Sequence, residues 1–240
     1  MWELFFKTPL LNLLIFFYQV LGHNLGLAII ALTFFLRLLL LPLTWPALSS
    51  AQKLKKLQPH LDKLKEKHGQ DKTALAKAQW ELYQEHGFNP LAGCLPLLLS
   101  LPVMLALYQV LLQALNLEFW QELNAKLYFS FLQIKGPEEL VTRFLWFDLT
   151  KPDPFFILPL LVGVSQLLNA YLMPSPAPAA SSNKKGESEE LMKMIQQQNR
   201  YLFPLFSAFI TLRLPAGVGL YWFFSTVFGI IQQFIINRRS

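Results

Sequence analysis

The chain has 240 residues, of which 53% are hydrophobic and only 15% are charged, with a formal net charge of +6 and a mean hydropathy of +0.35. Soluble domains contain nearer ~25% charged residues, so the composition excludes an ordinary soluble protein and indicates a membrane protein. The single cysteine, Cys94, excludes an internal disulfide and any metal site built from several cysteines.

The first segment, residues 1–22, is apolar but interrupted near its start by Glu3, Lys7 and Pro9. We expect it to form an external interfacial helix that lies along the membrane rather than crossing it. It has neither a basic start nor a small-residue cleavage site, so a removable signal peptide is not expected.

The next segment, residues 23–45, carries one charge, Arg37, inside a long apolar stretch. The break at Gly22 to Asn24 predicts a helix start near Leu25. Twelve residues from there would cover only about 18 Å, so the helix must continue through Arg37 to cross the membrane. An arginine at that depth is costly and marks a functional site. The alternative is a span over Phe17–Leu36, with Arg37 reaching the interface from its end.

Residues 46–90 are predicted to form a cytosolic helical hairpin. Leucines at 54, 57, 61 and 64 form one helical stripe, and the residues at 75, 78 and 82 form a weaker second one. Pro59 should kink the first arm. The lysines of this segment either have a binding role or only keep a helical face solvated.

Uncharged apolar runs and polar linkers define the rest of the chain. A bilayer core of about 30 Å requires roughly 20 apolar residues per helix. The remaining predicted segments are span two (91–113), an external segment with an interfacial helix (114–153), span three (154–173), a flexible cytosolic loop (174–193), span four (194–213), span five (214–236) and a cytosolic tail (237–240).

The distribution of basic residues predicts the orientation. With five spans, fourteen Lys and Arg residues fall on the side of the hairpin and six on the other side, which leaves Arg37 within the membrane. Basic residues favour the cytosolic side, so the N-terminus is expected outside and the C-terminus in the cytosol. We therefore predict an all-α membrane protein with five transmembrane helices.

Several kinds of catalysis are disfavoured by the sequence. The predicted spans contain no Asp or Glu, which argues against a carboxylate proton relay, an aspartyl protease and a carboxylate cation site. No nucleotide-binding motif and no metal-ligand spacing of histidines is present, so we predict no cofactor, no metal and no covalent chemistry.

The spans do contain uncharged polar residues, which join helices or line a hydrated groove around the arginine. Thr33 lies one turn before Arg37 and shares its helical face. The others are Gln109 and Gln113 in span two, Ser165, Gln166 and Asn169 in span three, Ser207 and Thr211 in span four, and Tyr221, Ser225 and Thr226 in span five.

Four sequence signatures occur in order along the chain: TFFLRLLLLPLT (33–44), NPLAGCLPLLLSLPVMLALY (89–108), WFDLTKPDPFFILPLLVGV (146–164) and LPAGVGLYWFFSTVFGIIQQ (214–233). With a charged helical hairpin between the first two, the chain resembles the YidC/Oxa/Alb membrane protein insertases over nearly its whole length. The resemblance implies a five-helix core with a groove open to cytosol and lipid.

The resemblance also implies the site and the partners. Arg37 falls at the family's intramembrane arginine, and Thr33, Tyr221 and Trp222 fall at positions that line or flank the groove. We add Ser100, Gln109 and Asn169 as polar groove candidates, although Ser100 stands where many relatives have Gln. The implied partners are nascent membrane proteins, membrane lipids and possible ribosome and Sec translocon contacts, with no nucleic acid substrate, in a bacterial plasma membrane.

Two departures and two rival functions accompany the resemblance. The tail after Ile236 is short, so ribosome docking through it should be weak, and the large external domain of some bacterial members has no counterpart in this sequence. One rival is a small transporter or anion channel that uses Arg37 as a binding charge. The other is a scaffold that only assists the assembly of other membrane proteins.

Overall fold

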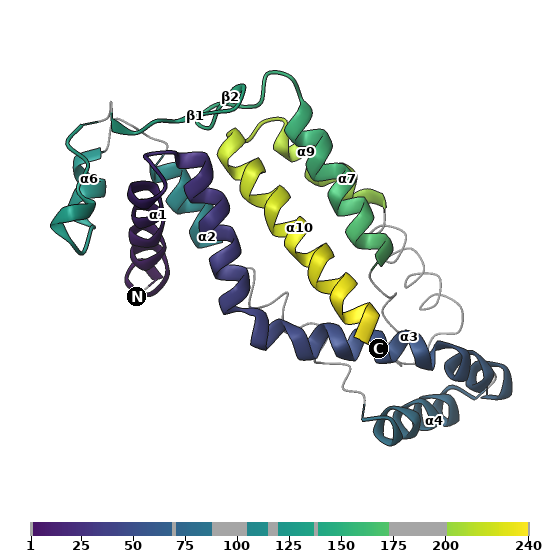
Figure 1. Ribbon diagram of the computed structural model, residues 1–240. Coiled ribbons are helices and arrows are strands. Elements are labelled where there is room, and N and C mark those ends of the chain that lie inside the picture. The colour runs from purple at the N-terminus through teal and green to yellow at the C-terminus, as the bar shows by residue number, and fades with distance from the viewer. Residues whose placement is uncertain are drawn as a thin grey trace.

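The computed structural model describes residues 2–68, 71–87, 105–114, 120–136, 139–172 and 201–239. Helices dominate, as expected, and they form an elongated arrangement with α10 running along its middle (Figure 1). The elements are η1 (Glu3–Lys7), α1 (Thr8–Val20), α2 (Leu25–Leu39), α3 (Leu41–His68), α4 (Lys72–Glu85), α6 (Trp120–Ala125), η4 (Ser130–Leu132), β1 (Arg143–Phe144), β2 (Phe147–Asp148), α7 (Ile157–Leu172), α9 (Phe203–Thr211) and α10 (Ala216–Arg239), together with a helical segment over Leu105–Ala114.

Helices α1 and α2 form a packed pair at the start of the chain. The turn between them contains Gly22 and His23, both with positive φ, and Asn24 then caps α2 by accepting a hydrogen bond from the Leu27 N–H at 3.0 Å. Leu14 and Ile15 of α1 are fully buried. One apolar face of α1 therefore faces the protein core, while Phe16 and Val20 of the same helix are exposed.

Helix α10 packs against α2 on one side and against α7 on the other, and α9 packs against α7. Close approach at this junction requires a glycine. A Cβ added to Gly219 would lie 2.8 Å from both Leu158 Cδ2 and Thr211 Cγ2. At the α7–α9 contact, a Cβ on Gly163 would lie 3.0 Å from the Cβ of Ala208. Small residues thus let three helix backbones meet closely, as in membrane helix bundles.

One end of α10 is held by a short β-ribbon. Strands β1 and β2 pair antiparallel, with Arg143 opposite Asp148 and Phe144 opposite Phe147. The backbone that follows β2 accepts hydrogen bonds from the first N–H groups of α10, from Ala216 to Lys151 O at 2.8 Å and from Gly217 to Leu149 O at 3.0 Å. The ribbon is a departure from the all-α expectation, because aromatic residues on both sides of a two-residue turn favour strand pairing.

The segment over 114–153 is expected to contain an interfacial helix, and its described residues contain the short helix α6. Helix α6 has only six residues, and its Leu123 is buried in the core instead of facing lipid. Asn12 of α1 fixes the segment that follows, since its Oδ1 accepts from the Tyr128 N–H at 2.7 Å and its Nδ2 donates to Lys126 O at 3.0 Å. Backbone groups of this segment are therefore satisfied by α1, which favours a compact connection over a helix.

Helices α3 and α4 lie beyond the other end of α10 (Figure 1). They share a small core of their own, formed by Leu57 and Leu61 of α3 with Tyr83 of α4. Pro59 lies inside α3. Gln232 of α10 donates to the Thr44 hydroxyl of α3 at 3.0 Å, which ties the two helices together.

The expectation of one unbroken helix over 23–45 is corrected by the structure. Helix α2 ends at Leu39, Leu40 forms a turn, and α3 begins at Leu41. Pro42 explains the break, because it has no N–H to donate to Leu38 and fits the first turn of a new helix. The predicted start near Leu25 agrees with the structure.

Among the described residues, one helix is long and apolar enough to cross a membrane, α10 over Ala216–Arg238. Shorter apolar helices cover Leu25–Leu39, Leu105–Ala114 and Ile157–Leu172. The predicted loop at 174–193 lies outside the described residues. So do most of span two and most of the first half of span four. The number of spans and the orientation therefore stay predictions.

Candidate functional site

Arg37 of α2 and Ser225 of α10 meet between the two helices. The Arg37 Nε donates to the Ser225 hydroxyl oxygen at 3.0 Å, and a terminal guanidinium nitrogen donates to the same oxygen. Tyr221 lies one turn before Ser225 on α10, so its phenol shares a helical face with the Ser225 hydroxyl. The contact positions the charge of α2 against the polar face of α10.

The charge of Arg37 has no carboxylate partner within the described parts of the chain. The ion pairs found there join Lys7 and Lys126 to Glu3, and Lys151 to Asp148. Arginine stays protonated in proteins, so hydroxyl groups can orient this guanidinium but cannot neutralise it. The site is therefore a fixed positive charge able to attract an anionic group.

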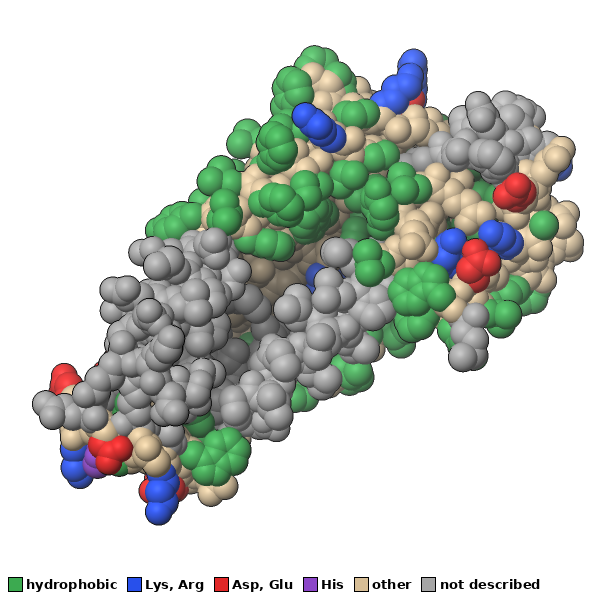
Figure 2. Space-filling view, turned by 180° about the vertical axis from the view of Figure 1, so that it is seen from behind, with side chains coloured by type: hydrophobic (Ala, Val, Ile, Leu, Met, Phe, Trp, Pro, Cys, Tyr) green, Lys and Arg blue, Asp and Glu red, His purple; other side chains and the backbone are tan. Residues whose placement is uncertain are grey.

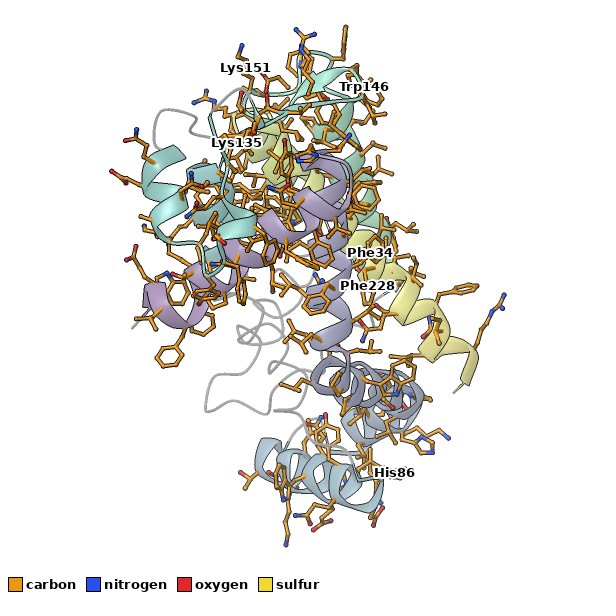
Figure 3. The ribbon with its side chains drawn as sticks, turned by 60° about the vertical axis from the view of Figure 1, so that its left-hand side comes forward. Phe34, His86, Lys135, Trp146, Lys151 and Phe228 are labelled. Carbon is orange, nitrogen blue, oxygen red and sulfur yellow. The ribbon has the colours of Figure 1, made fainter. Side chains whose placement is uncertain are left out.

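Aromatic side chains form the wall on one side of the α2–α10 contact. The ring of Phe34 packs edge-to-face with Phe228 at 5.8 Å and with Phe224 at 6.1 Å between centroids. Figure 3 shows Phe34 and Phe228 in the middle of the molecule, between the end that carries Trp146 and the end that carries His86. The α2–α10 contact that holds Arg37 is thus apolar around its charge.

The face seen in Figure 2 is hollowed in its middle, and part of a basic side chain is visible inside the hollow. Hydrophobic side chains gather along one edge of it. Arg37 itself is partly exposed, although its neighbours Leu32, Thr33 and Leu36 are buried. The guanidinium is bonded at one edge, and no carboxylate of the described residues pairs with its charge.

Thr33, predicted to share the site, is fully buried and donates its hydroxyl to Ile29 O of its own helix at 2.6 Å. It lies one turn from Arg37, and no hydrogen bond between the two is found in the described region. Ser207 and Thr211 of α9 make the same kind of bond, to Phe203 O at 2.7 Å and Ser207 O at 2.6 Å. These hydroxyls are satisfied inside their own helices.

The other predicted site residues are spread over the molecule. Gln109 is exposed, and its Oε1 accepts from the Trp2 indole N–H at 3.2 Å. Asn169 of α7 faces α10, with its Oδ1 3.9 Å from a Cβ placed on Gly229. Trp222 is half-buried on α10, and Ser100 lies outside the described residues. Of the predicted set, Tyr221 lies one helical turn from Ser225, whose hydroxyl accepts from Arg37.

Ser225 was among the span-five polar residues that the sequence offered for a groove, but it was not singled out as a site residue. A signal for it exists in the sequence, because Ser225 follows Tyr221 by four residues and so lies on the same helical face. Ranking the polar residues of span five by their helical phase relative to Tyr221 would have identified it.

Further polar contacts tie α10 to its neighbours. The Gln166 amide on α7 donates to the Thr226 hydroxyl at 3.1 Å, and the Gln233 amide donates to Leu172 O at 3.1 Å. Within the described residues, the Gln233 Oε1 is buried without a hydrogen-bond partner. The searched part of the chain contains no group of three or more potential metal-ligating side chains.

Comparison with known proteins supplies the family context. A sequence model of the family described as "60Kd inner membrane protein" matches residues 16–240. Among similar proteins, the "Membrane protein insertase YidC" of Wolinella succinogenes is 37% identical over 235 residues, which are 98% of this chain and 37% of that protein. The protein of the same name from Fusobacterium nucleatum is 35% identical over 217 residues, covering 90% of this chain and 88% of its own length.

A third similar protein, the "Membrane protein insertase YidC" of Oleidesulfovibrio alaskensis, is 36% identical over all 240 residues of this chain and is covered over 39% of its own length. The chain therefore spans well under half of the Wolinella and Oleidesulfovibrio relatives and most of the Fusobacterium relative.

Proposed function

The chain belongs to the 60Kd inner membrane protein family, and from this premise we propose that it is a membrane protein insertase. In this proposal it moves short hydrophilic tails across the bilayer and releases hydrophobic segments into lipid. Five spans, an external N-terminus and a cytosolic C-terminus in a bacterial plasma membrane complete the arrangement.

The observation that carries the proposal is the pairing of Arg37 with Ser225. A permanent charge held between two apolar helices has a high desolvation cost, which a folded protein rarely accepts without a functional reason. The hydroxyl orients the guanidinium and leaves its charge available. An incoming acidic tail is the kind of ligand that such a charge attracts.

The mechanism rests on shortening the dry path for a polar tail. Each unsatisfied polar group that enters hydrocarbon costs several kcal/mol, so an unaided tail crosses slowly. A hydrated groove around Arg37 lowers this barrier, because the tail keeps water and gains a favourable charge interaction. The membrane potential adds about 2.3 kcal/mol per charge per 100 mV for acidic tails.

Release into lipid follows from the hydrophobicity of the substrate. Large apolar side chains remain exposed on α7 and α9, among them Leu160, Leu205 and Phe209. A substrate helix that slides along such a surface reaches lipid and gains its own transfer free energy. The process requires neither covalent chemistry nor nucleotide hydrolysis.

The proposed partners follow from the same function. Nascent membrane proteins are the substrates, lipids receive the product, and a ribosome or Sec translocon delivers some chains. The hairpin of α3 and α4 extends from the helical core and is the part of the described structure best placed to meet such partners (Figure 1).

The test is insertion of a single-span substrate into proteoliposomes that contain the purified chain. We expect Arg37→Ala to reduce the crossing of an acidic tail about tenfold or more and Arg37→Lys to retain most of it, while a neutral tail is affected less. Arg213→Ala is the matched control, because Arg213 is exposed at the end of α9. Full activity of Arg37→Ala on acidic tails would refute the electrostatic role, and anion flux through the protein would favour a channel instead.

A further inference from the structure

The segment from Arg143 to Phe156 lies at one end of the helical bundle. Its backbone at Lys151 and Leu149 accepts the hydrogen bonds of the first two N–H groups of α10, at 2.8 and 3.0 Å. Helix α10 is the membrane-length helix of the described chain, and it begins at Ala216. The segment therefore lies at the depth where that helix ends, which is the boundary between hydrocarbon and water.

Four large apolar side chains of this segment are exposed. They are Leu145 at 72%, Trp146 at 46%, Phe155 at 64% and Phe156 at 61% exposed. We call these four residues the rim patch. Figure 3 shows Trp146 and Lys151 at the same end of the molecule, opposite His86.

The backbone holds two rim-patch residues in an unfavourable conformation. Leu145 has φ +54° and Phe156 has φ +57°, in the left-handed region that favours glycine or asparagine. Leu145 is also the first residue of the two-residue loop between β1 and β2, where positive φ is normally supplied by glycine. Burial inside the chain does not compensate for this strain, because both side chains are exposed.

Basic residues accompany the rim patch. Arg143 is exposed, and the Lys151 side chain is 76% exposed, with its ammonium group 3.9 Å from Asp148 Oδ2. Aromatic rings beside Lys and Arg at the end of a membrane helix are typical of contact with the lipid interface. The rings enter the boundary between headgroups and acyl chains, and the cations meet the phosphates.

We propose that the rim patch is a lipid anchor, in which Leu145, Trp146, Phe155 and Phe156 insert into the adjacent leaflet while Arg143 and Lys151 bind lipid phosphates. The anchor fixes the β-ribbon against the bilayer and, through the bonds to Ala216 and Gly217, sets the depth of α10 and of Ser225 on it. It rests on the membrane placement of α10 and is independent of insertase activity.

The experiment uses the full chain in liposomes that contain a phospholipid with a photoreactive diazirine next to its headgroup. After illumination, mass spectrometry maps the lipid-labelled peptides. We expect labelling of the 143–156 peptide well above that of the α4 peptide with Trp80, which is also exposed, at 55%. The variant L145N/F156N replaces both apolar side chains by asparagine, which tolerates positive φ. It should reduce the 143–156 labelling about threefold or more.

Phe129→Asn is the matched control, because Phe129 is an aromatic side chain of similar exposure, 58%, outside the rim patch. It should leave the 143–156 labelling unchanged. Labelling of 143–156 no higher than that of the Trp80 peptide would overturn the anchor. Equal labelling in L145N/F156N would do the same. Strong labelling together with absent insertion activity would instead count against the proposed function and leave the anchor standing.

Discussion

The Arg37 guanidinium on α2 donates to the Ser225 hydroxyl on α10 at 3.0 Å, across 188 positions of sequence. A hydrogen bond to a charged group contributes about 1.5–3 kcal/mol, so this contact orients the charge as well as joining two helices. Tyr221 lies one turn before Ser225, so a second hydroxyl shares the face of α10 that meets Arg37.

Removal of the Ser225 hydroxyl should impair the site without removing its charge. We expect Ser225→Ala to slow the crossing of acidic tails about threefold to tenfold, less than Arg37→Ala does, because the guanidinium loses its orientation only. Ser225→Thr should restore the rate. Ser207→Ala is the control, since that hydroxyl bonds only within its own helix. If Ser225→Ala caused the same further loss of activity in an Arg37→Ala background, Ser225 would act independently of the arginine, and the prediction would be wrong.

Helix packing at Gly219 should tolerate no added methyl group. In Gly219→Ala the new Cβ would lie 2.8 Å from Leu158 and Thr211 carbons, so the helices must move apart, at a cost of about 1–3 kcal/mol. Denaturant unfolding in detergent micelles measures this loss.

Gly229→Ala on the same helix is the control for Gly219. Its Cβ would meet nothing closer than Asn169 Oδ1 at 3.9 Å, so helix propensity predicts a neutral effect or a gain of up to about 1 kcal/mol. If both variants lost the same stability, the close junction of α7, α9 and α10 would not be the cause.

Asp153 should determine where α7 begins. Its buried carboxylate accepts from the Phe155 N–H at 3.1 Å and from the Leu158 N–H at 2.7 Å, so it caps the helix. We expect Asp153→Ala to cost about 0.5–2 kcal/mol and to speed hydrogen exchange in the first turn of α7. Asp71→Ala, which removes the equivalent cap of α4, should affect exchange in α4 alone. Unchanged exchange at Leu158 would exclude the capping role.

Tyr18 should make the external connection sensitive to alkaline pH. Burial raises the pKa of the Tyr18 phenol above its usual range, and its hydroxyl oxygen accepts from the Val141 N–H at 3.0 Å. The unfolded chain loses the phenol proton near pH 10 and the folded chain only at higher pH. The stabilisation is therefore complete below about pH 10 and falls as the pH rises toward the folded-state pKa.

The Tyr18 prediction is checked by unfolding curves in detergent between pH 8 and about pH 11. Tyr18→Phe should be less stable at pH 8, because the Val141 N–H loses its acceptor, and should lose less further stability on alkaline titration. Tyr128→Phe, at an exposed phenol, is the control. The prediction would be contradicted if the wild-type chain lost no more stability than Tyr18→Phe as the pH is raised.

Local sequence signals predicted several parts of the fold correctly. The break at Gly22 to Asn24 indicated the start of α2 near Leu25, and the helical character of the chain followed from its apolar runs. The prediction that Arg37 marks a site rested on the cost of its charge and on the family resemblance. Its contact with Ser225 could not be predicted in the same way, because the crossing of α2 and α10 depends on side-chain packing along both helices.

Other features depended on competition between local preferences. The break at Leu40 arises because Pro42 removes one backbone hydrogen bond within an otherwise continuous apolar run. The apolar residues around Leu123 resemble an interfacial helix in periodicity, yet Asn12 of α1 satisfies the backbone of this connection and Leu123 enters the core. Predicting the connection around Leu123 would require knowing that Asn12 of α1 bonds to its backbone.

The sequence by itself determined that this chain is a largely helical membrane-family protein with one lone arginine in an apolar stretch, because hydrophobicity, charge and capping act over a few residues. Only the tertiary structure decided that the arginine meets Ser225, and that Leu145 and Phe156 hold strained, exposed positions at the end of α10. Those facts depend on how helices distant in sequence pack together, and that packing is set by the shape of whole surfaces.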